Sequence, residues 1–129
     1  MRILVVEDQD SIRSMISTLM RARGHEVVAV HNGSMALQHI AQFPPDAVLL
    51  DLMMPGPFGG IEVCKRVRSN PETARLPIVV VSAAAEDASR QEARAAGATA
   101  YHTKPFSPKA LLQEIDQLCV AERPLGNHN

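Results

Sequence analysis

The sequence lacks the features that mark several broad classes of protein. It has no surplus of positive charge, because 13 Lys and Arg stand against 14 Asp and Glu in 129 residues, giving a net charge of −1. A general nucleic-acid-binding domain normally carries a basic surplus or stripe, so we expect no direct nucleic-acid binding. No apolar run approaches membrane-spanning length, and the start MRILVVED is too short for the core of a secretion signal. We therefore expect a cytoplasmic protein with no membrane contact.

Cysteine is also scarce. Cys64 and Cys119 lie in separate predicted helices, and neither belongs to a CxxC motif or a Cys/His cluster. This pattern fits a reducing compartment, and we interpret both as small apolar side chains. The length suits one domain over residues 1–121, followed by a polar tail at 122–129 that contains Pro and Gly.

Short runs rich in Val, Ile and Leu alternate with segments of helical periodicity. The predicted strands are 3–6, 27–30, 47–50 and 78–81, with a weaker fifth at 98–102. The predicted helices are 11–23, 34–43, one marked by Ile61, Cys64 and Val67, then 86–96 and 107–121. Strands that are apolar at every position are buried on both faces, which favours a parallel sheet between helices. We predict an α/β fold of the (βα)5 type, a doubly wound five-stranded parallel sheet in the flavodoxin-like order 2-1-3-4-5.

The helical segments differ in how much apolar surface they offer. The first presents five apolar residues on one face: Ile12, Met15, Ile16, Leu19 and Met20. Gly24 predicts its end, and Ser107 with Pro108 predicts the capped start of the last helix. Segment 86–96 has only a thin apolar stripe, so we expect a loosely held helix that is able to shift.

Polar side chains follow four of the five predicted strands. Glu7 and Asp8 follow the first, Asp51 the third and Lys104 the fifth, and Ser82 ends the fourth. Ligands of open α/β sheets bind beyond the carboxyl ends of the strands, and the predicted order makes these four strands neighbours. Glu7, Asp8, Ser82 and Lys104 each have an ordinary explanation as a cap or turn residue, whereas Asp51 is unusual at the end of an apolar strand. Their conjunction predicts one site.

Three close carboxylates repel one another unless a cation lies between them. An all-oxygen set with few protein ligands suits Mg²⁺ better than Zn²⁺ and leaves positions for phosphate oxygens. A carboxylate beside such an ion can attack phosphorus and form an acyl phosphate, while Lys104 offers a positive charge to the phosphoryl group. We predict that Asp51 is the residue that becomes phosphorylated.

Four stretches together resemble the receiver domain of two-component response regulators: ILVVED, PPDAVLLDLMMPG, LPIVVVSA and GATAYHTKPF. The resemblance covers about residues 1–121. It implies that Asp51 accepts a phosphoryl group from a phosphohistidine on a sensor histidine kinase or a histidine phosphotransfer protein. It also implies that Asp8, Asp51 and the backbone carbonyl of Met53 bind Mg²⁺ directly, with Glu7 helping through water.

The resemblance further implies a switch. Ser82 would reorient to hydrogen-bond the phosphoryl group, Lys104 would pair with it, and Tyr101 would turn inward when Ser82 moves. Phosphorylation adds about −1.5 to −2 charge, which can bias two arrangements of the fourth and fifth βα units. The downstream protein target stays unknown, and we expect a monomer or a weak dimer on phosphorylation.

The loop after Asp51 departs from the family pattern. MPGPFGGIE is one residue longer than usual, with Pro57 and Phe58 where Met and Asp are common. We expect an effect on partner choice or dephosphorylation rate rather than a loss of activity. Ser82 stands where Thr is commoner and keeps the hydroxyl.

Other readings remain open at this stage. An aspartyl-phosphate phosphatase would need a second Asp where Met53 stands, and a flavin or nucleotide module would need a phosphate-binding loop in place of Glu7 and Asp8. We therefore expect no turnover of other substrates. A receiver-like docking module that does not switch, or a receiver fragment of a larger regulator with an output domain, is equally compatible with the fold.

Overall fold

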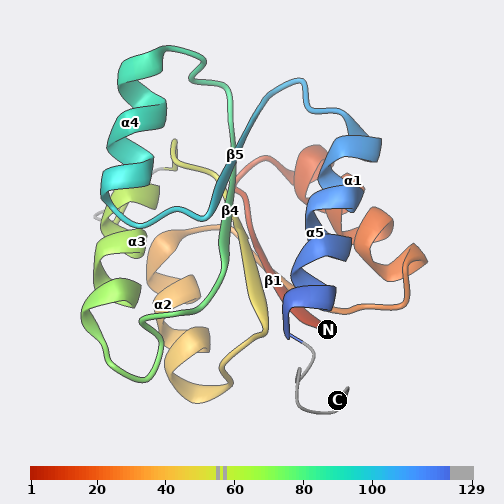
Figure 1. The fold of residues 1–129 in the computed structure, drawn as a ribbon, viewed down its shortest axis with the longest axis horizontal. Coiled ribbons are helices and arrows are strands. Elements are labelled where there is room, and N and C mark those ends of the chain that lie inside the picture. Colours follow the sequence, from red (N-terminus) through yellow and green to blue (C-terminus); the bar gives the residue numbers. More distant parts are fainter. Residues whose placement is uncertain (55, 57, 123–129) are drawn as a thin grey trace.

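The computed structural model describes residues 1–54, 56 and 58–122, which form a three-layered α/β domain (Figure 1). The central sheet is parallel throughout and has the order β2-β1-β3-β4-β5. Its strands are β1 (Arg2–Val6), β2 (Glu26–Val30), β3 (Ala47–Leu50), β4 (Ile78–Ser82) and β5 (Ala100–Thr103). The predicted fold class and strand order are confirmed.

Five helices connect the strands and cover both faces of the sheet (Figure 1). They are α1 (Asp10–Ala22), α2 (Gly33–Gln42), α3 (Gly60–Ser69), α4 (Asp87–Ala95) and α5 (Pro108–Glu122). Helices α1 and α5 lie on one face, and α2, α3 and α4 lie on the other. Gly24 follows α1 with a φ of 88°, a conformation that suits glycine, and Ser107 Oγ caps α5 by accepting from the Ala110 N–H at 3.1 Å.

The sheet separates two apolar cores because successive strand residues point to opposite faces. Ile3 and Val5 of β1 pack with Ile16, Met20 and the apolar face of α5. Leu4 and Val6 pack on the other side with apolar residues of α2, α3 and α4. Every residue of β3 and β4 is buried, as expected for strands that are covered on both faces.

Three local expectations were wrong. The second strand is not buried on both faces, because it is the sheet edge and leaves Val28 45 % exposed. Met15 is also 45 % exposed, because the buried stripe of α1 is narrower than the apolar stripe in its sequence. The fifth strand begins at Ala100 rather than 98, since Gly97 adopts a φ of 109° and the Ala98 N–H still bonds back to the Ala93 carbonyl of α4.

The tail predicted at 122–129 lies outside the described residues apart from Glu122, which ends α5. Within the described part of the chain, the helices are all too short or too polar to cross a membrane.

Candidate functional site

The strand register brings the predicted site residues to one edge of the sheet. Val6 pairs with Leu50, Leu50 pairs with Val80, and Ser82 pairs with Thr103. The residues that directly follow β1, β3 and β5, together with Ser82 at the end of β4, therefore lie at neighbouring strand ends. As predicted, the structure places Glu7, Asp8, Asp51, Ser82 and Lys104 there.

Three carboxylates form the acidic part of this edge. Oxygen atoms of Glu7, Asp8 and Asp51 all lie within 4.8 Å of one another. Glu7 is 1 % exposed and Asp51 is 4 % exposed, whereas Asp8 is half-buried and open to solvent. The backbone N–H of Met53 donates to Asp51 Oδ1 at 3.0 Å, which fixes the orientation of that carboxylate.

Lys104 connects two of these carboxylates. Its Nζ donates to Glu7 Oε1 at 2.7 Å and to Asp51 Oδ2 at 3.2 Å. The second oxygen of Glu7, Oε2, accepts from the Gln9 N–H at 3.1 Å. Both Glu7 oxygens are thus engaged within the protein, while the Asp8 carboxylate makes no hydrogen bond to the described residues and is partly open to solvent.

The site holds more negative charge than one ammonium group can balance. Burial raises the pKa of Glu7, although the hydrogen bond from Lys104 opposes this effect. Burial alone would lower the pKa of Lys104, but its hydrogen bond to Glu7 and the charge of Asp51 outweigh burial, so that pKa is raised. Both groups therefore retain protons more strongly than in water, Glu7 chiefly because it is buried and Lys104 because it is paired with carboxylates.

Ser82 and Tyr101 lie in a chain of hydrogen bonds beside this cluster. Ser82 is fully buried, and its Oγ accepts from the Ala84 N–H at 3.3 Å. The Tyr101 hydroxyl donates to the Ala84 carbonyl at 2.5 Å, and the Lys104 N–H donates to the Ser82 carbonyl at 2.8 Å. The two predicted switch residues are therefore connected through the β4–α4 loop.

Two glycines that the sequence reasoning passed over shape the β3–α3 loop. A Cβ on Gly60 would lie 2.6 Å from the Asp51 carbonyl oxygen, so glycine allows α3 to begin against the Asp51 backbone. A Cβ on Gly33, at the start of α2, would likewise collide with the backbone carbonyl oxygen of Phe58. Phe58 is half-buried, and the guanidinium carbon of Arg66 lies 4.3 Å from the centre of its ring. Pro57, the other unusual residue of this loop, lies outside the described residues.

A cavity of about 450 Å³ opens beside Asp8, between the starts of α2 and α3. Its lining comes from the loop after β1, the β2–α2 turn with the first residues of α2, and the β3–α3 loop. It consists of Asp8, His31, Asn32, Gly33, Ser34, Gly56 and Phe58. The motif pattern gave no signal for this cavity, because its walls are contributed by segments about 25 residues apart whose packing depends on Gly33.

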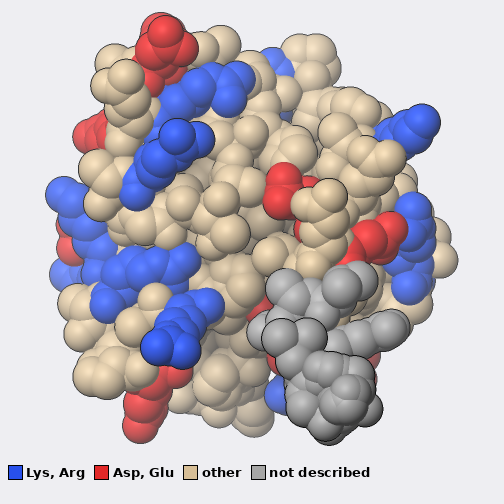
Figure 2. All heavy atoms as spheres, viewed as in Figure 1, with Lys and Arg blue, Asp and Glu red and all other residues tan. Residues whose placement is uncertain are grey.

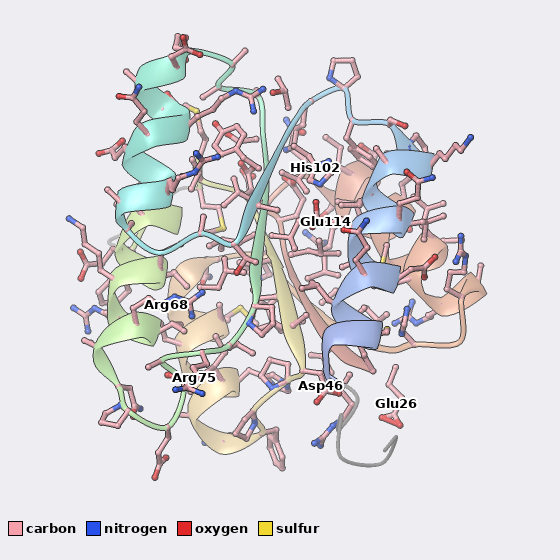
Figure 3. The ribbon with its side chains drawn as sticks, viewed as in Figure 1. Glu26, Asp46, Arg68, Arg75, His102 and Glu114 are labelled. Atoms are coloured by element: carbon pink, nitrogen blue, oxygen red, sulfur yellow. The ribbon has the colours of Figure 1, made fainter. Side chains whose placement is uncertain are left out.

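Charge is unevenly distributed over the face formed by α4, β5 and α5. In Figure 2, Lys and Arg side chains gather over the α3 and α4 side, with acidic side chains along its margins, and both signs appear towards α5. Figure 3 shows His102 of β5 and Glu114 of α5 pointing toward each other, and the His102 Nε2 lies 3.4 Å from Glu114 Oε1.

Comparisons with known proteins agree with this geometry. Residues 3–116 match the family model described as the response regulator receiver domain. The phosphate regulon transcriptional regulatory protein PhoB of Rhizobium meliloti is 36 % identical over 123 residues, covering 95 % of this chain and 54 % of that protein. The DNA-binding response regulator MtrA of Mycolicibacterium smegmatis is 37 % identical over 114 residues, covering 88 % of this chain and 48 % of its own.

The fold comparison extends to solved structures. The chemotaxis protein CheY4 of Vibrio cholerae superposes with a TM-score of 0.84 at 32 % identity, over 91 % of this chain and 97 % of that one. The present chain therefore corresponds to nearly the whole of that structure, but it spans only about half the length of the two regulators it matches.

Proposed function

This chain belongs to the response regulator receiver domain family, as its sequence motifs indicated, and on that premise we propose that Asp51 accepts a phosphoryl group from a phosphohistidine donor in a Mg²⁺-dependent reaction. The observation that carries the proposal is the cluster of three carboxylate groups within 4.8 Å, two of them bound by one lysine. Receiver domains are not turnover enzymes on other substrates, and we propose that the only phosphoryl-transfer chemistry here is gain and loss of the Asp51 phosphoryl group.

The donor set suits a magnesium ion. All candidate ligands are oxygen atoms, and Asp8 at the solvent side leaves room for water, which Mg²⁺ retains readily. Asp8, Asp51 and the Met53 carbonyl would hold the ion, which supplies positive charge to phosphoryl oxygens when bound. Glu7 would act through water, a role supported by the engagement of both its oxygens by Lys104 and Gln9.

The residues of the chain then divide the work of phosphoryl transfer. A carboxylate oxygen of Asp51 attacks phosphorus, the N–P bond of the donor breaks, and its electron pair returns to the imidazole nitrogen. The Met53 N–H orients the attacking carboxylate, and Lys104 is placed to exchange its Asp51 contact for a phosphoryl oxygen. Ser82 would donate its hydroxyl proton to another phosphoryl oxygen, with Tyr101 following the β4–α4 loop.

We propose that residues 1–122 act on partners through protein contacts: a sensor histidine kinase or histidine phosphotransfer protein upstream, and a protein target downstream. The two regulators named above are described as transcriptional or DNA-binding proteins and are about twice as long as the matched region. An output of that kind would therefore belong to a chain longer than this domain. Both cysteines are free, which supports a cytoplasmic location.

The test is the intact mass after incubation with Mg²⁺ and acetyl phosphate. We expect wild type to gain one phosphoryl group, Asp51→Asn to gain none, and chelator to prevent the gain. Asp46→Asn is the matched control, because Asp46 precedes the same strand at its opposite end and accepts from the Arg2 N–H. A gain that persists in Asp51→Asn would show that the acceptor is misassigned, and no gain in wild type would favour a docking module that does not switch.

A further inference from the structure

Helix α4 is attached to the domain by little apolar packing. Ala93 is its one buried residue, whereas α3 buries four residues and α1 buries three. Burial of a single methyl group contributes on the order of 1 kcal/mol, which is a weak anchor for a nine-residue helix. The position of α4 must therefore depend on polar contacts to a greater extent than that of its neighbours.

Arginine side chains supply such contacts at both ends of α4. Arg68, which lies on α3 near the α4–β5 turn (Figure 3), donates to the Gly97 carbonyl at 3.0 Å and to the Leu76 carbonyl at 2.6 Å. Near the other end, Arg90 in the first turns of α4 reaches across to β5. Its Nη2 donates to Thr103 Oγ1 at 2.6 Å, and its guanidinium carbon lies 4.9 Å from the centre of the Tyr101 ring.

These two contacts reinforce each other geometrically. Tyr101 and Thr103 are two residues apart on β5, so their side chains project from the same face of the strand. The planar guanidinium can stack on an aromatic face and donate along its edge at the same time, which a lysine ammonium cannot do. Arg90 is half-buried, so water competes less for these contacts than it does at an exposed arginine.

Both partners of Arg90 lead directly to the candidate site. Tyr101 donates its hydroxyl proton to the Ala84 carbonyl, and the Ala84 N–H donates to Ser82 Oγ. Thr103 pairs with Ser82 in the sheet and immediately precedes Lys104. A displacement of Ser82 or Lys104 therefore reaches Arg90 through one or two contacts.

We propose that Arg90 is a positioning residue that fastens α4 to Tyr101 and Thr103, so that α4 moves together with the strand end that carries Lys104. This inference rests on the proposed function, since the displacement it transmits originates from a phosphoryl group at Asp51. Without the Arg90 contacts, the site would still bind the phosphoryl group, but α4 would no longer follow it.

The chain offers a matched control on the same helix. Arg94 lies one turn beyond Arg90 and is exposed, and its side chain forms no hydrogen bond or ion pair with the described residues. Arg94→Gln removes the same charge from α4 as Arg90→Gln but leaves the Arg90 hydrogen bond to Thr103 of β5 in place. Thr103→Val removes the hydrogen-bond acceptor of Arg90 while keeping the shape of the side chain.

The experiment compares these three variants with wild type, using beryllium fluoride with Mg²⁺ as the phosphoryl mimic. Binding is followed by the fluorine resonance of the bound mimic. The response of β5 is followed by tyrosine emission, which is specific because the chain has one Tyr and no Trp. The response of α4 is followed by amide hydrogen exchange over residues 87–95, with and without the mimic.

In the unliganded protein, we expect Arg90→Gln and Thr103→Val to raise α4 exchange rates by about fivefold or more, because local opening becomes easier. The affinity of both variants for the mimic should stay within about threefold of the wild-type affinity, since the contacts that the mimic makes at Asp51 are unchanged. Their mimic-induced changes in tyrosine emission and in α4 exchange should fall below about half of the wild-type change. Arg94→Gln should match wild type in all three measurements.

Two results would overturn the proposal. One is an Arg90→Gln variant whose α4 exchange and tyrosine response equal those of wild type. The other is an Arg94→Gln variant that behaves like Arg90→Gln, which would assign the effect to helix charge rather than to the β5 contacts. Failure of the proposed function would look different: wild type would show no bound fluorine resonance, while exchange rates in the unliganded variants would still decide whether Arg90 fastens α4.

Discussion

Replacement of Lys104 by methionine should show how strongly one ammonium group holds the acidic site together. Its Nζ lies 2.7 Å from Glu7 Oε1 and 3.2 Å from Asp51 Oδ2. With an effective dielectric constant of about 20, these two attractions amount to roughly 6 and roughly 5 kcal/mol before solvation is considered. The cost of removing the charges from water offsets most of this sum, and breaking a buried pair by losing one partner typically costs about 3–5 kcal/mol.

Protonation of Glu7 limits how much unfolding free energy the Lys104→Met variant can lose. Once Lys104 is gone, Glu7 can bind a proton instead of remaining a buried, unpaired anion. Holding a proton at about pH 7.5 on a carboxyl group whose ordinary pKa is about 4.3 costs about 4 kcal/mol. Burial already raises the pKa of Glu7, so less than the full amount is needed. We therefore expect Lys104→Met to lower the free energy of unfolding by about 3 kcal/mol at that pH in the absence of divalent ions.

The pH dependence has a definite sign. In Lys104→Met the pKa of Glu7 in the folded state lies above its unfolded value, so the stabilising form is the protonated one. The contribution of Glu7 to the free energy of unfolding is therefore fully present below its pKa in the unfolded state. It is lost as the pH rises through its pKa in the folded state. The loss of unfolding free energy relative to wild type should therefore shrink by about 1.4 kcal/mol for each pH unit as the solution is acidified, until the pH reaches the raised pKa that Glu7 has in the wild type.

The assay is urea unfolding of wild type, Lys104→Met and Lys109→Met, first with chelator and then with excess Mg²⁺. Lys109 is exposed near the start of α5 and serves as the matched control. Mg²⁺ should reduce the difference in unfolding free energy between wild type and Lys104→Met, because the ion brings positive charge to the same carboxylates. Equal stability of Lys104→Met and Lys109→Met in the presence of chelator would contradict this prediction. A loss of unfolding free energy that does not change with pH would also contradict it, because it would indicate lost packing instead of a lost charge.

Further predictions concern the loop, the cysteines and the metal. Gly60→Ala should destabilise the fold by about 2 kcal/mol in urea unfolding, because its Cβ meets backbone at 2.6 Å, whereas Gly59→Ala, with a nearest contact of 3.5 Å, should cost far less. Native protein should react rapidly with a disulfide reagent at no more than one thiol, since Cys64 is fully buried and burial raises its pKa to about 11; rapid reaction of both would contradict this. Asp8→Asn should weaken Mg²⁺ binding by about tenfold or more, measured as loss of the Mg²⁺-induced rise in unfolding midpoint; an unchanged rise would remove Asp8 from the metal site.

Much of the fold follows from local patterns in the sequence. The fully apolar strands at 47–50 and 78–81 could only be buried on both faces, and their position in the chain leaves few alternatives to the order 2-1-3-4-5. The site followed in turn, because parallel strands bring their carboxyl ends together. Glu7, Asp51 and Lys104 therefore meet at contact distance although nearly 100 positions separate the first from the last.

The features that escaped prediction depend on side-chain packing between elements. Met15 and Val28 are apolar by type, and only the finished structure shows that each is 45 % exposed. Arg90 lies in a helical segment with few apolar residues, and sequence periodicity carries no information about which strand an arginine can reach. The same applies to Gly33, whose missing side chain matters only because Phe58 packs against it.

The contact between Gly33 and Phe58 has a consequence for protein engineering. The backbone of Phe58, in the loop after β3, rests on the start of α2 at a point where any side chain would intrude. Transplanting this loop into another receiver would therefore fail unless the host also carries glycine at the position of Gly33. The two segments form one exchangeable module, and recombination experiments that swap receivers piecewise should place their crossover points outside both.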